Sequence, residues 1–132
     1  MYLISACLCG VNCKYNGANN YNEICDKLFS SGKAILVCPE QLGGLPTPRI
    51  PSEIINYSKE NSQKDITIIN KNGDNVSKEF IKGAQEVLNI AKKLNIKKAI
   101  LKEGSPSCGV NYIYEETLMA LKYLEWVLQQ KF

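Results

Sequence analysis

The sequence predicts an α/β fold: a small three-layer, Rossmann-like domain with a short, mainly parallel sheet, an edge hairpin and helices on both faces. Three short apolar runs, at residues 2–6, 34–37 and 98–101, have the length and composition of buried strands. The stretches that separate them show helical spacing of apolar residues, which is typical of βαβ units. Each run also leads directly into a loop that carries a cysteine.

The first helix is predicted between the first two strands. Residues 21–31 place Ile24, Cys25, Leu28 and Phe29 on one helix face. Free cysteine behaves as a small hydrophobe, so we expect Cys25 to be buried on this face.

Two further helices are predicted towards the carboxyl end. The longer one spans residues 77–94 and has Ser77 as its expected N-cap. Its apolar residues keep helical spacing: Phe80, Ile81, Ala84, Val87, Leu88, Ala91 and Leu94. The other begins near Thr117, with Tyr123 and Trp126 outside its apolar stripe, where they are candidates for sheet packing or a homo-oligomer contact.

The remaining connections are predicted to be loops. Residues 7–17 are rich in glycine and asparagine, which favour a loop over a regular element. Residues 38–54 contain four prolines and two glycines, which predict a rigid, irregular loop. Within residues 66–76 an Asn-Gly step between β-branched residues predicts the edge hairpin.

The composition is that of a soluble domain, and we expect residues 1–132 to form one. The chain is 45% hydrophobic and 22% charged, so it can bury a core without disulfide bonds. Its net charge of +3, from 16 basic and 13 acidic residues, is too small and too scattered to indicate nucleic-acid binding. No apolar run reaches the roughly 18 residues of a membrane span, and the amino terminus lacks a signal-peptide pattern, so we expect a cytoplasmic protein without a membrane partner.

Six cysteines and no histidine limit the chemistry that the chain can perform. In a reducing compartment, cysteines favour metal binding or catalysis over structural disulfides. The absence of histidine excludes Ser-His-Asp and Cys-His catalysis. Acid-base chemistry therefore falls to carboxylates, lysines, hydroxyls or thiols.

Three of the cysteines, Cys7, Cys38 and Cys108, follow the three predicted strands. Because ligands bind at the carboxyl edge of open α/β sheets, where parallel strands end together, we expect the three sulfur atoms to converge there. Glu40, two residues after Cys38, is expected to point into the same crevice.

These thiols leave several functions open. A zinc site is one, with Cys9 or Cys13 as the fourth ligand. A cubane iron–sulfur cluster with three cysteine ligands and one open iron is another. A redox or nucleophilic thiol and chemically inert thiols are the remaining interpretations.

A set of short motifs occurs in a defined order along the chain. They are Ser5-Ala6-Cys7-Leu8 with Lys14-Tyr15-Asn16-Gly17, then Cys38-Pro39-Glu40 with Gly43-Gly44-Leu45 and Pro48-Arg49-Ile50-Pro51, and last Ser105-Pro106-Ser107-Cys108-Gly109. Together they resemble the thiouracil desulfidase family, first described as domain of unknown function 523. The family pattern usually has arginine where Lys14 stands.

The resemblance implies a [4Fe-4S] cluster held by Cys7, Cys38 and Cys108, with Cys13 as the reserve ligand. One iron is then open to the sulfur of a small thiolated pyrimidine such as 2-thiouracil, and iron is thiophilic. The family chemistry is a non-redox desulfuration that releases hydrosulfide. A cluster of this kind can be lost from protein prepared in air.

The same resemblance implies roles for further residues. Glu40 would take a proton from the water that attacks the thiocarbonyl carbon, and Ser105 would hydrogen-bond the substrate or relay a proton. Ser107, Gly43 and Gly44 are the implied substrate contacts.

The alternative to an enzyme is a non-catalytic metal or cluster module. It would hold zinc or an iron–sulfur cluster in a closed cage of four cysteines, namely Cys7, Cys13, Cys38 and Cys108.

The single arginine of the chain, Arg49, lies between Pro48 and Pro51. A guanidinium offers a planar fork of donors that a lysine cannot replace. We therefore expect Arg49 to brace its loop by pairing with a carboxylate such as Glu53 rather than to contact substrate.

Overall fold

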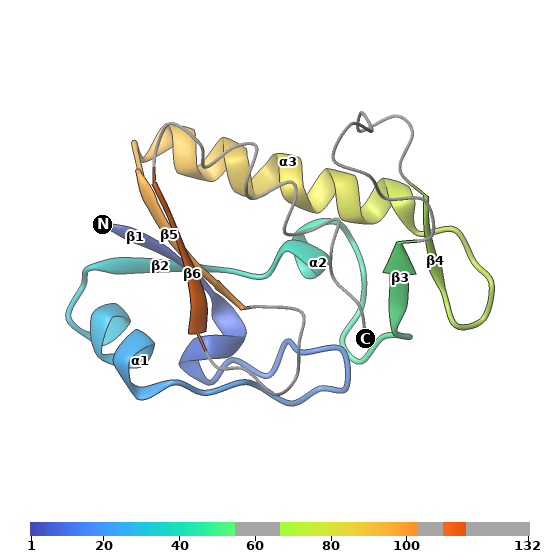
Figure 1. The fold of residues 1–132 in the computed structure, drawn as a ribbon, viewed down its shortest axis with the longest axis horizontal. Coiled ribbons are helices and arrows are strands. Elements are labelled where there is room, and N and C mark those ends of the chain that lie inside the picture. The colour runs from blue at the N-terminus through green and yellow to red at the C-terminus, as the bar shows by residue number, and fades with distance from the viewer. Residues whose placement is uncertain (55–66, 103–109, 116–132) are drawn as a thin grey trace.

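A four-stranded sheet in the order β2-β1-β5-β6 forms the centre of the computed structural model, which describes residues 1–54, 67–102 and 110–115, with backbone alone at 53–54 and 110–115 (Figure 1). β1 pairs in parallel with both β2 and β5, and β6 runs antiparallel to β5. The strands are β1 (Tyr2–Ser5), β2 (Ala34–Val37), β5 (Lys98–Lys102) and β6 (Val110–Glu115). The three predicted parallel strands are confirmed, and β6 is a strand that the sequence analysis missed.

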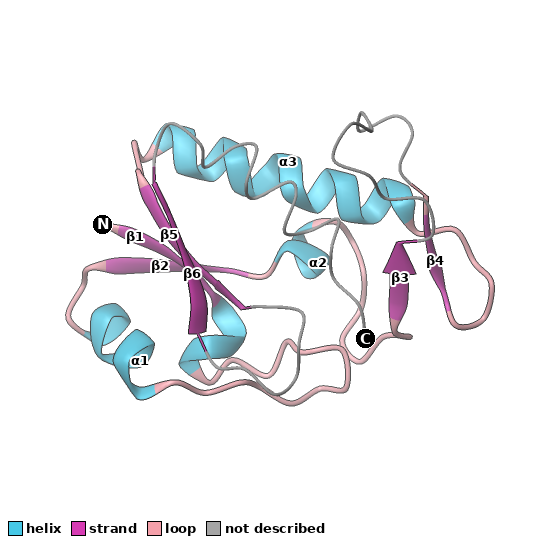
Figure 2. Cartoon of the chain, viewed as in Figure 1, coloured by secondary structure: helices cyan, strands magenta, loops and turns pink. Residues whose placement is uncertain are grey.

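Helices cover both faces of this sheet, as predicted (Figure 2). Alternate residues of a strand point to opposite faces. Leu3 and Leu101 therefore pack into a cluster with residues of α3, whereas Ile4 and Ile100 pack into a second cluster that includes Cys25 of α1. The helices are η1 (Ala6–Cys9), α1 (Glu23–Ser30), α2 (Pro39–Leu42) and α3 (Ser77–Lys93).

Helix α1 has the predicted position and buries Cys25 as expected. It begins after Asn22, whose side-chain oxygen accepts a hydrogen bond from the Cys25 backbone N–H at 3.1 Å. The prediction that Ile24 and Phe29 share the buried face is wrong, since Ile24 is 71% exposed and Phe29 42%. A two-turn helix buries only a narrow stripe, and neighbouring positions are rotated about 100° away from it.

Helix α3 is confirmed, but the predicted role of Ser77 as its N-cap is wrong. The residue that caps the helix is Val76, with no side-chain hydrogen bond. The Ser77 hydroxyl instead accepts a hydrogen bond from the Ile68 backbone N–H at 2.7 Å. Ser77 therefore ties the start of α3 to the preceding strand.

The proline-rich segment is more regular than the predicted loop. Pro39 occupies the first turn of α2, where its missing N–H costs no helical hydrogen bond. The segment ends in β3 (Ser52–Ile54), which pairs antiparallel with β4 (Ile68–Asn70) in a separate two-stranded sheet. The residues between α2 and β3 keep the predicted irregular form.

The predicted edge hairpin is reduced to its turn. Gly73 has a φ of 87°, as an Asn-Gly turn requires, and Asn70 Oδ1 accepts backbone hydrogen bonds from Asn72 and Asp74. After the turn only Asn75 forms a bridge with Ile69, because the chain enters α3 two residues later. β4 takes β3 as its partner instead.

Helices α2 and α3 meet at two glycines. A Cβ atom added to Gly43 would lie 1.9 Å from the Glu79 carbonyl oxygen, and one added to Gly83 would lie 1.9 Å from the Pro39 carbonyl oxygen. Only residues without side chains allow this backbone approach. The contact fixes α2, which directly follows Cys38, against the long helix.

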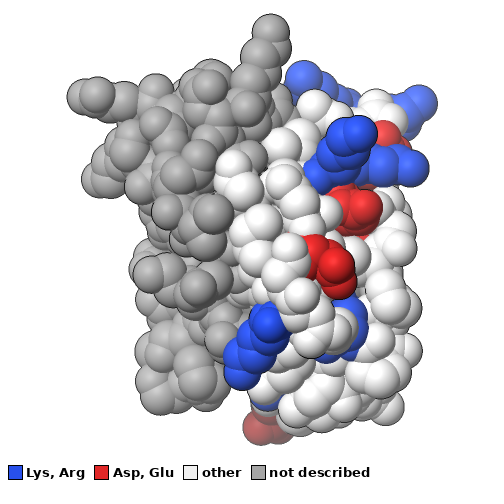
Figure 3. Space-filling model, turned by 90° about the vertical axis from the view of Figure 1, so that its right-hand side faces the viewer, with Lys and Arg blue, Asp and Glu red and all other residues white. Residues whose placement is uncertain are grey.

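The described surface has mixed charge. Figure 3, which views the molecule from the side of β3 and β4, shows basic and acidic residues interspersed on the described part of that face.

None of the helices within residues 1–54, 67–102 and 110–115 combines the length and apolarity needed to cross a membrane. The helix predicted from Thr117 lies outside the described residues.

Replacing Gly83 by alanine should destabilise the protein by about 2 kcal/mol, because the added methyl group overpacks the contact with Pro39. At an exposed helical site the same change would stabilise by up to about 1 kcal/mol. Urea denaturation measures the difference. Lys82→Ala, at the exposed neighbouring position of α3, is the control and should change stability by less than about 0.5 kcal/mol. Equal or greater stability of Gly83→Ala would contradict the close approach of the two helices.

Candidate active site

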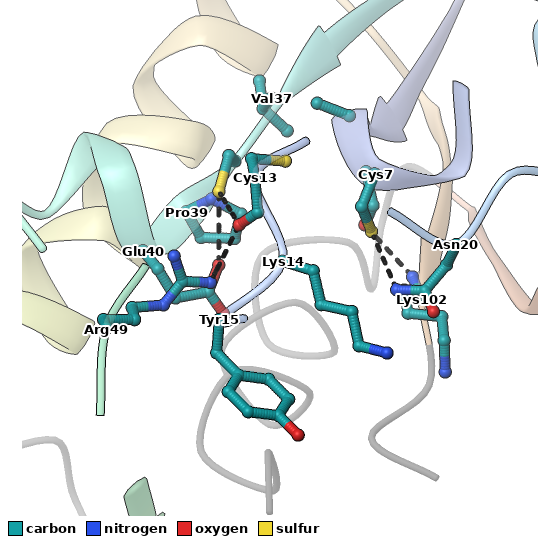
Figure 4. Close-up of a pocket in the computed structure, with 13 residues that line it drawn as sticks. Cys7, Cys13, Lys14, Tyr15, Asn20, Val37, Pro39, Glu40, Arg49 and Lys102 are labelled. Atoms are coloured by element: carbon teal, nitrogen blue, oxygen red, sulfur yellow. Dashed lines mark hydrogen bonds and ion pairs between the residues drawn. The ribbon is translucent and has the colours of Figure 1, made fainter. Parts of the chain in front are cut away.

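A pocket lies where the parallel strands end (Figure 4). Its walls come from the residues that follow β1 and β2 and from the last residue of β5. Cys7, Cys38 and Glu40 all line it, so the structure brings these three predicted site residues together. Cys108, Ser105 and Ser107 lie outside the described residues.

Cys7 is held at the end of β1 by the loop that follows. The loop turns back so that Asn20 donates a backbone hydrogen bond to the Cys7 carbonyl oxygen at 2.9 Å. The Asn20 side-chain amide donates to Cys7 Sγ at 3.5 Å. Burial raises the pKa of Cys7, and the hydrogen bond from Asn20 acts against that rise. An amide donor aimed at sulfur is also suited to a metal-bound thiolate.

Cys38 follows β2 and precedes the first turn of α2. Its Sγ lies 3.8 Å from the Cys13 carbonyl oxygen and 3.6 Å from Glu40 Oε2. The Cys38 thiol donates to both oxygens. Interaction with the Cys13 thiol, which is buried beside it, lowers the pKa of Cys38 and raises the pKa of Cys13. Cys38 is thus the described cysteine whose surroundings favour the thiolate.

Arg49 braces the pocket, and its partner carboxylate is Glu40. The guanidinium Nη2 lies 3.8 Å from Glu40 Oε2 and 3.0 Å from the Cys13 carbonyl oxygen. Its Nη1 donates to the Pro46 carbonyl oxygen at 3.4 Å and to Thr47 Oγ1 at 3.2 Å. Both side chains of the ion pair are less than a tenth exposed. The predicted bracing role is confirmed, although the example that the sequence suggested, Glu53, has no described side chain.

Two lysines, to which the sequence had assigned no role, line the pocket. Lys102, the last residue of β5, is buried, and Lys14 comes from the loop after β1. The Lys14 ammonium lies 5.9 Å from the centre of the Tyr15 ring. A signal for Lys102 was present, since a lysine that directly follows an apolar strand stands at the carboxyl edge of the sheet.

The other predicted residues have different surroundings. Gly43 packs against α3, and neither Gly43 nor Gly44 is among the described residues that line the pocket, so their role as substrate contacts stays a prediction. Cys9 is half-buried beside Cys25, and burial raises the pKa of Cys9 to about 11.

The donor set of the pocket fits a group held by thiolates. The five described cysteines are all free thiols, and two of them stand at the ends of adjacent parallel strands. Among the described residues no three His, Cys, Asp or Glu side chains are placed to hold a metal ion together. A site built on Cys7 and Cys38 therefore needs a further ligand, and Cys108 is the predicted one.

Comparisons with known proteins agree with one another. The model of a family described as 2-thiouracil desulfurase matches residues 2–125. The chain is 42% identical over 123 residues to YbbK, an uncharacterised protein of Bacillus subtilis (strain 168), covering 92% of this chain and 82% of that protein. A solved structure described as the [4Fe-4S]-dependent thiouracil desulfidase TudS is similar with a TM-score of 0.68 and 32% identity, covering 96% of this chain and 86% of that one.

Replacing Arg49 by methionine should lower the free energy of unfolding by about 3 kcal/mol, because Glu40 then keeps a buried charge without its partner. Equilibrium urea denaturation measures this loss of unfolding free energy. Lys27→Met breaks the exposed pair of Lys27 and Glu23 and serves as the control, with an expected loss below about 0.5 kcal/mol. Similar losses of unfolding free energy in the two variants would show that the buried pair stabilises the protein no more than the exposed pair does.

In cluster-free, reduced protein, Cys38 should be alkylated by iodoacetamide faster than Cys7, Cys9 or Cys13 near neutral pH. Its pKa is lowered while burial or hydrogen bonding raises the other three, so it has the largest thiolate fraction there. Mass spectrometry of the modified peptides measures the four rates. Cys13→Ala removes the neighbouring thiol and should slow the alkylation of Cys38, whereas Cys25→Ala should not. An unchanged rate in Cys13→Ala would contradict the effect of Cys13 on the pKa of Cys38.

Proposed function

This chain belongs to the 2-thiouracil desulfurase family, and from that premise we propose that it hydrolyses the C–S bond of a thiolated nucleobase such as 2-thiouracil and releases hydrosulfide. One observation carries the proposal. Two cysteines and a buried glutamate share a pocket at the carboxyl edge of the sheet, in a chain similar to a [4Fe-4S]-dependent thiouracil desulfidase.

We propose that Cys7, Cys38 and Cys108 hold a [4Fe-4S] cluster in this pocket. Support comes from the two free thiols at adjacent strand ends and from the amide of Asn20 directed at the Cys7 sulfur. When bound, such a cluster supplies a Lewis-acidic, thiophilic iron that polarises a thiocarbonyl group.

Glu40 is the proposed general base. Its carboxylate is buried, lies 3.6 Å from Cys38 Sγ and is held by Arg49. A fixed carboxylate at this place can take the proton of a water molecule that attacks the thiocarbonyl carbon. Water supplies the oxygen of the product, sulfur leaves as hydrosulfide and one proton is released, so the reaction needs no electron donor or acceptor.

The remaining predicted residues complete the proposed site. Ser105 hydrogen-bonds the substrate or relays a proton, and Ser107, Gly43 and Gly44 contact the pyrimidine ring. Arg49 is a positioning residue, because it touches Glu40 and the loops around the pocket.

A non-catalytic cage of four cysteines remains the second candidate, and one observation favours it. Cys13 is buried directly beside Cys38 and lines the same pocket. Cys7, Cys13 and Cys38, which all lie within the described residues, are not placed to hold a metal ion together, so a cage would require these three side chains to move closer to one another. A closed cage would bind its metal with four cysteine ligands and leave no position for a substrate.

Anaerobic reconstitution should give a brown protein that releases sulfide from 2-thiouracil. Cys7→Ser, Cys38→Ser and Cys108→Ser should each lose the iron, the sulfide and the activity, because each removes a ligand. Cys13→Ala separates the two candidates: an open site keeps its iron, and a four-cysteine cage loses it. Cys25→Ala, on the buried face of α1, is the control and should keep both its iron and its activity. A protein that stays colourless after reconstitution would rule out the cluster.

Glu40→Gln should lower kcat about 100-fold or more while the iron content stays at the wild-type level, because the amide cannot accept the proton. The Arg49 guanidinium keeps its hydrogen bonds to the Cys13 and Pro46 carbonyl oxygens, so the loops keep this part of their brace. Steady-state sulfide release and iron analysis measure the two quantities. The control combines Glu40→Gln with Gln41→Glu, which places a carboxylate at the exposed next position. This double variant should stay as inactive as Glu40→Gln.

A further inference from the structure

The described lining of the pocket carries more positive than negative charge. Its cationic residues are Lys14, Arg49 and Lys102, and its anionic residue is Glu40. Arg49 and Glu40 pair with each other. Lys14 and Lys102 are the other two cations among the described residues that line the pocket, and the proposed reaction has assigned them no role.

Lys102 is held in a fixed position. It is the last residue of β5, which lies between β1 and β6 in the sheet, and its backbone N–H donates to Ser5 Oγ at 3.1 Å. The residue is only 7% exposed. Figure 4 places its side chain on the same side of the pocket as Cys7 and Asn20.

Lys14 is less constrained. It lies in the loop after η1, is half-buried and has its ammonium 5.9 Å from the ring of the neighbouring Tyr15. A charge that is already in place acts on a reaction without the cost of reorganisation, whereas a more mobile one must be ordered first. Lys102 is therefore the better placed of the two cations.

The proposed function creates a charge that a cation of this kind can stabilise. A neutral thiocarbonyl compound and neutral water give a carbonyl compound, hydrosulfide and a proton. The C–S bond breaks with its electron pair on sulfur, so negative charge develops on sulfur inside the pocket. In a buried site a fixed ammonium stabilises such a charge more than it does in water.

We propose that Lys102, with a smaller contribution from Lys14, forms a binding site for anionic sulfur on the Cys7 side of the pocket. This inference rests on the proposed desulfuration. Anionic sulfur has two sources there, the hydrosulfide that leaves and the thiolate form of a deprotonated substrate. The charge that every turnover generates is that of hydrosulfide, so hydrosulfide is the ligand that we assign to Lys102.

The test uses the anaerobically reconstituted full-length protein titrated with sodium hydrosulfide. Visible absorbance of the protein follows binding at equilibrium, without turnover. Lys102→Met should weaken hydrosulfide binding about tenfold or more and lower kcat for 2-thiouracil about 100-fold, with unchanged iron content. Lys14→Met should have a smaller effect, and Lys102→Arg should keep most of the affinity because it keeps the charge.

Lys98→Met, at the exposed start of the same strand, is the matched control and should bind hydrosulfide as the wild type does. A second titration with 2-thiouracil separates the two sources. If Lys102→Met binds 2-thiouracil more weakly but hydrosulfide as tightly as the wild type, Lys102 contacts the substrate and the inference is overturned. Wild-type hydrosulfide affinity in Lys102→Met would also overturn it. Should the methionine variant not fold, Lys102→Gln against Lys102→Arg makes the same comparison. Failure of the wild type to release sulfide from any thiolated base would instead refute the proposed function.

Discussion

The ion pair between Arg49 and Glu40 is the interaction on which the geometry of the pocket depends. It is almost fully buried, and the same guanidinium also binds the carbonyl oxygens of Cys13 and Pro46. One side chain thus joins the loop around Cys13 to the segment from Glu40 to Arg49. A buried charge without a partner is costly, so the pair favours the arrangement in which the glutamate stands next to Cys38.

The sheet supplies the second constraint. Strands β1, β2 and β5 run in parallel, so the residues that follow them gather at one edge. Cys7 follows β1, Cys38 follows β2 and Lys102 ends β5, which puts two thiols and an ammonium around one pocket. The close contact of α2 with α3 at Gly43 and Gly83 then fixes the segment that carries Glu40. Cys7, Glu40 and Lys102 thus reach the pocket from helices and a strand and Cys38 from the residue that follows β2, whereas Lys14 and Arg49 come from loops.

Some elements of the fold could be predicted from the amino-acid sequence and others could not, for identifiable reasons. The three parallel strands and α3 were predicted well, since burial leaves an apolar run or a periodic pattern, whereas the antiparallel strand β6 was missed. Short elements were not predicted well, because α2 and β3 hold too few residues to show a period and depend on partners elsewhere in the chain. Ser77 illustrates the limit: a serine before an apolar helix is a good N-cap by local criteria, yet its hydroxyl binds the backbone of Ile68.

The sequence alone determined the positions of the three parallel strands, the burial of Cys25, the family resemblance and the availability of thiols, because each is recorded in residue types and their spacing. Tertiary structure alone decided which groups surround those thiols. That Glu40 is the partner of Arg49, that the Cys38 thiol lies against the Cys13 carbonyl oxygen and that Lys102 enters the pocket all follow from contacts between residues that are not neighbours in sequence. Such contacts arise from the packing of whole elements, and no local pattern of residues encodes them.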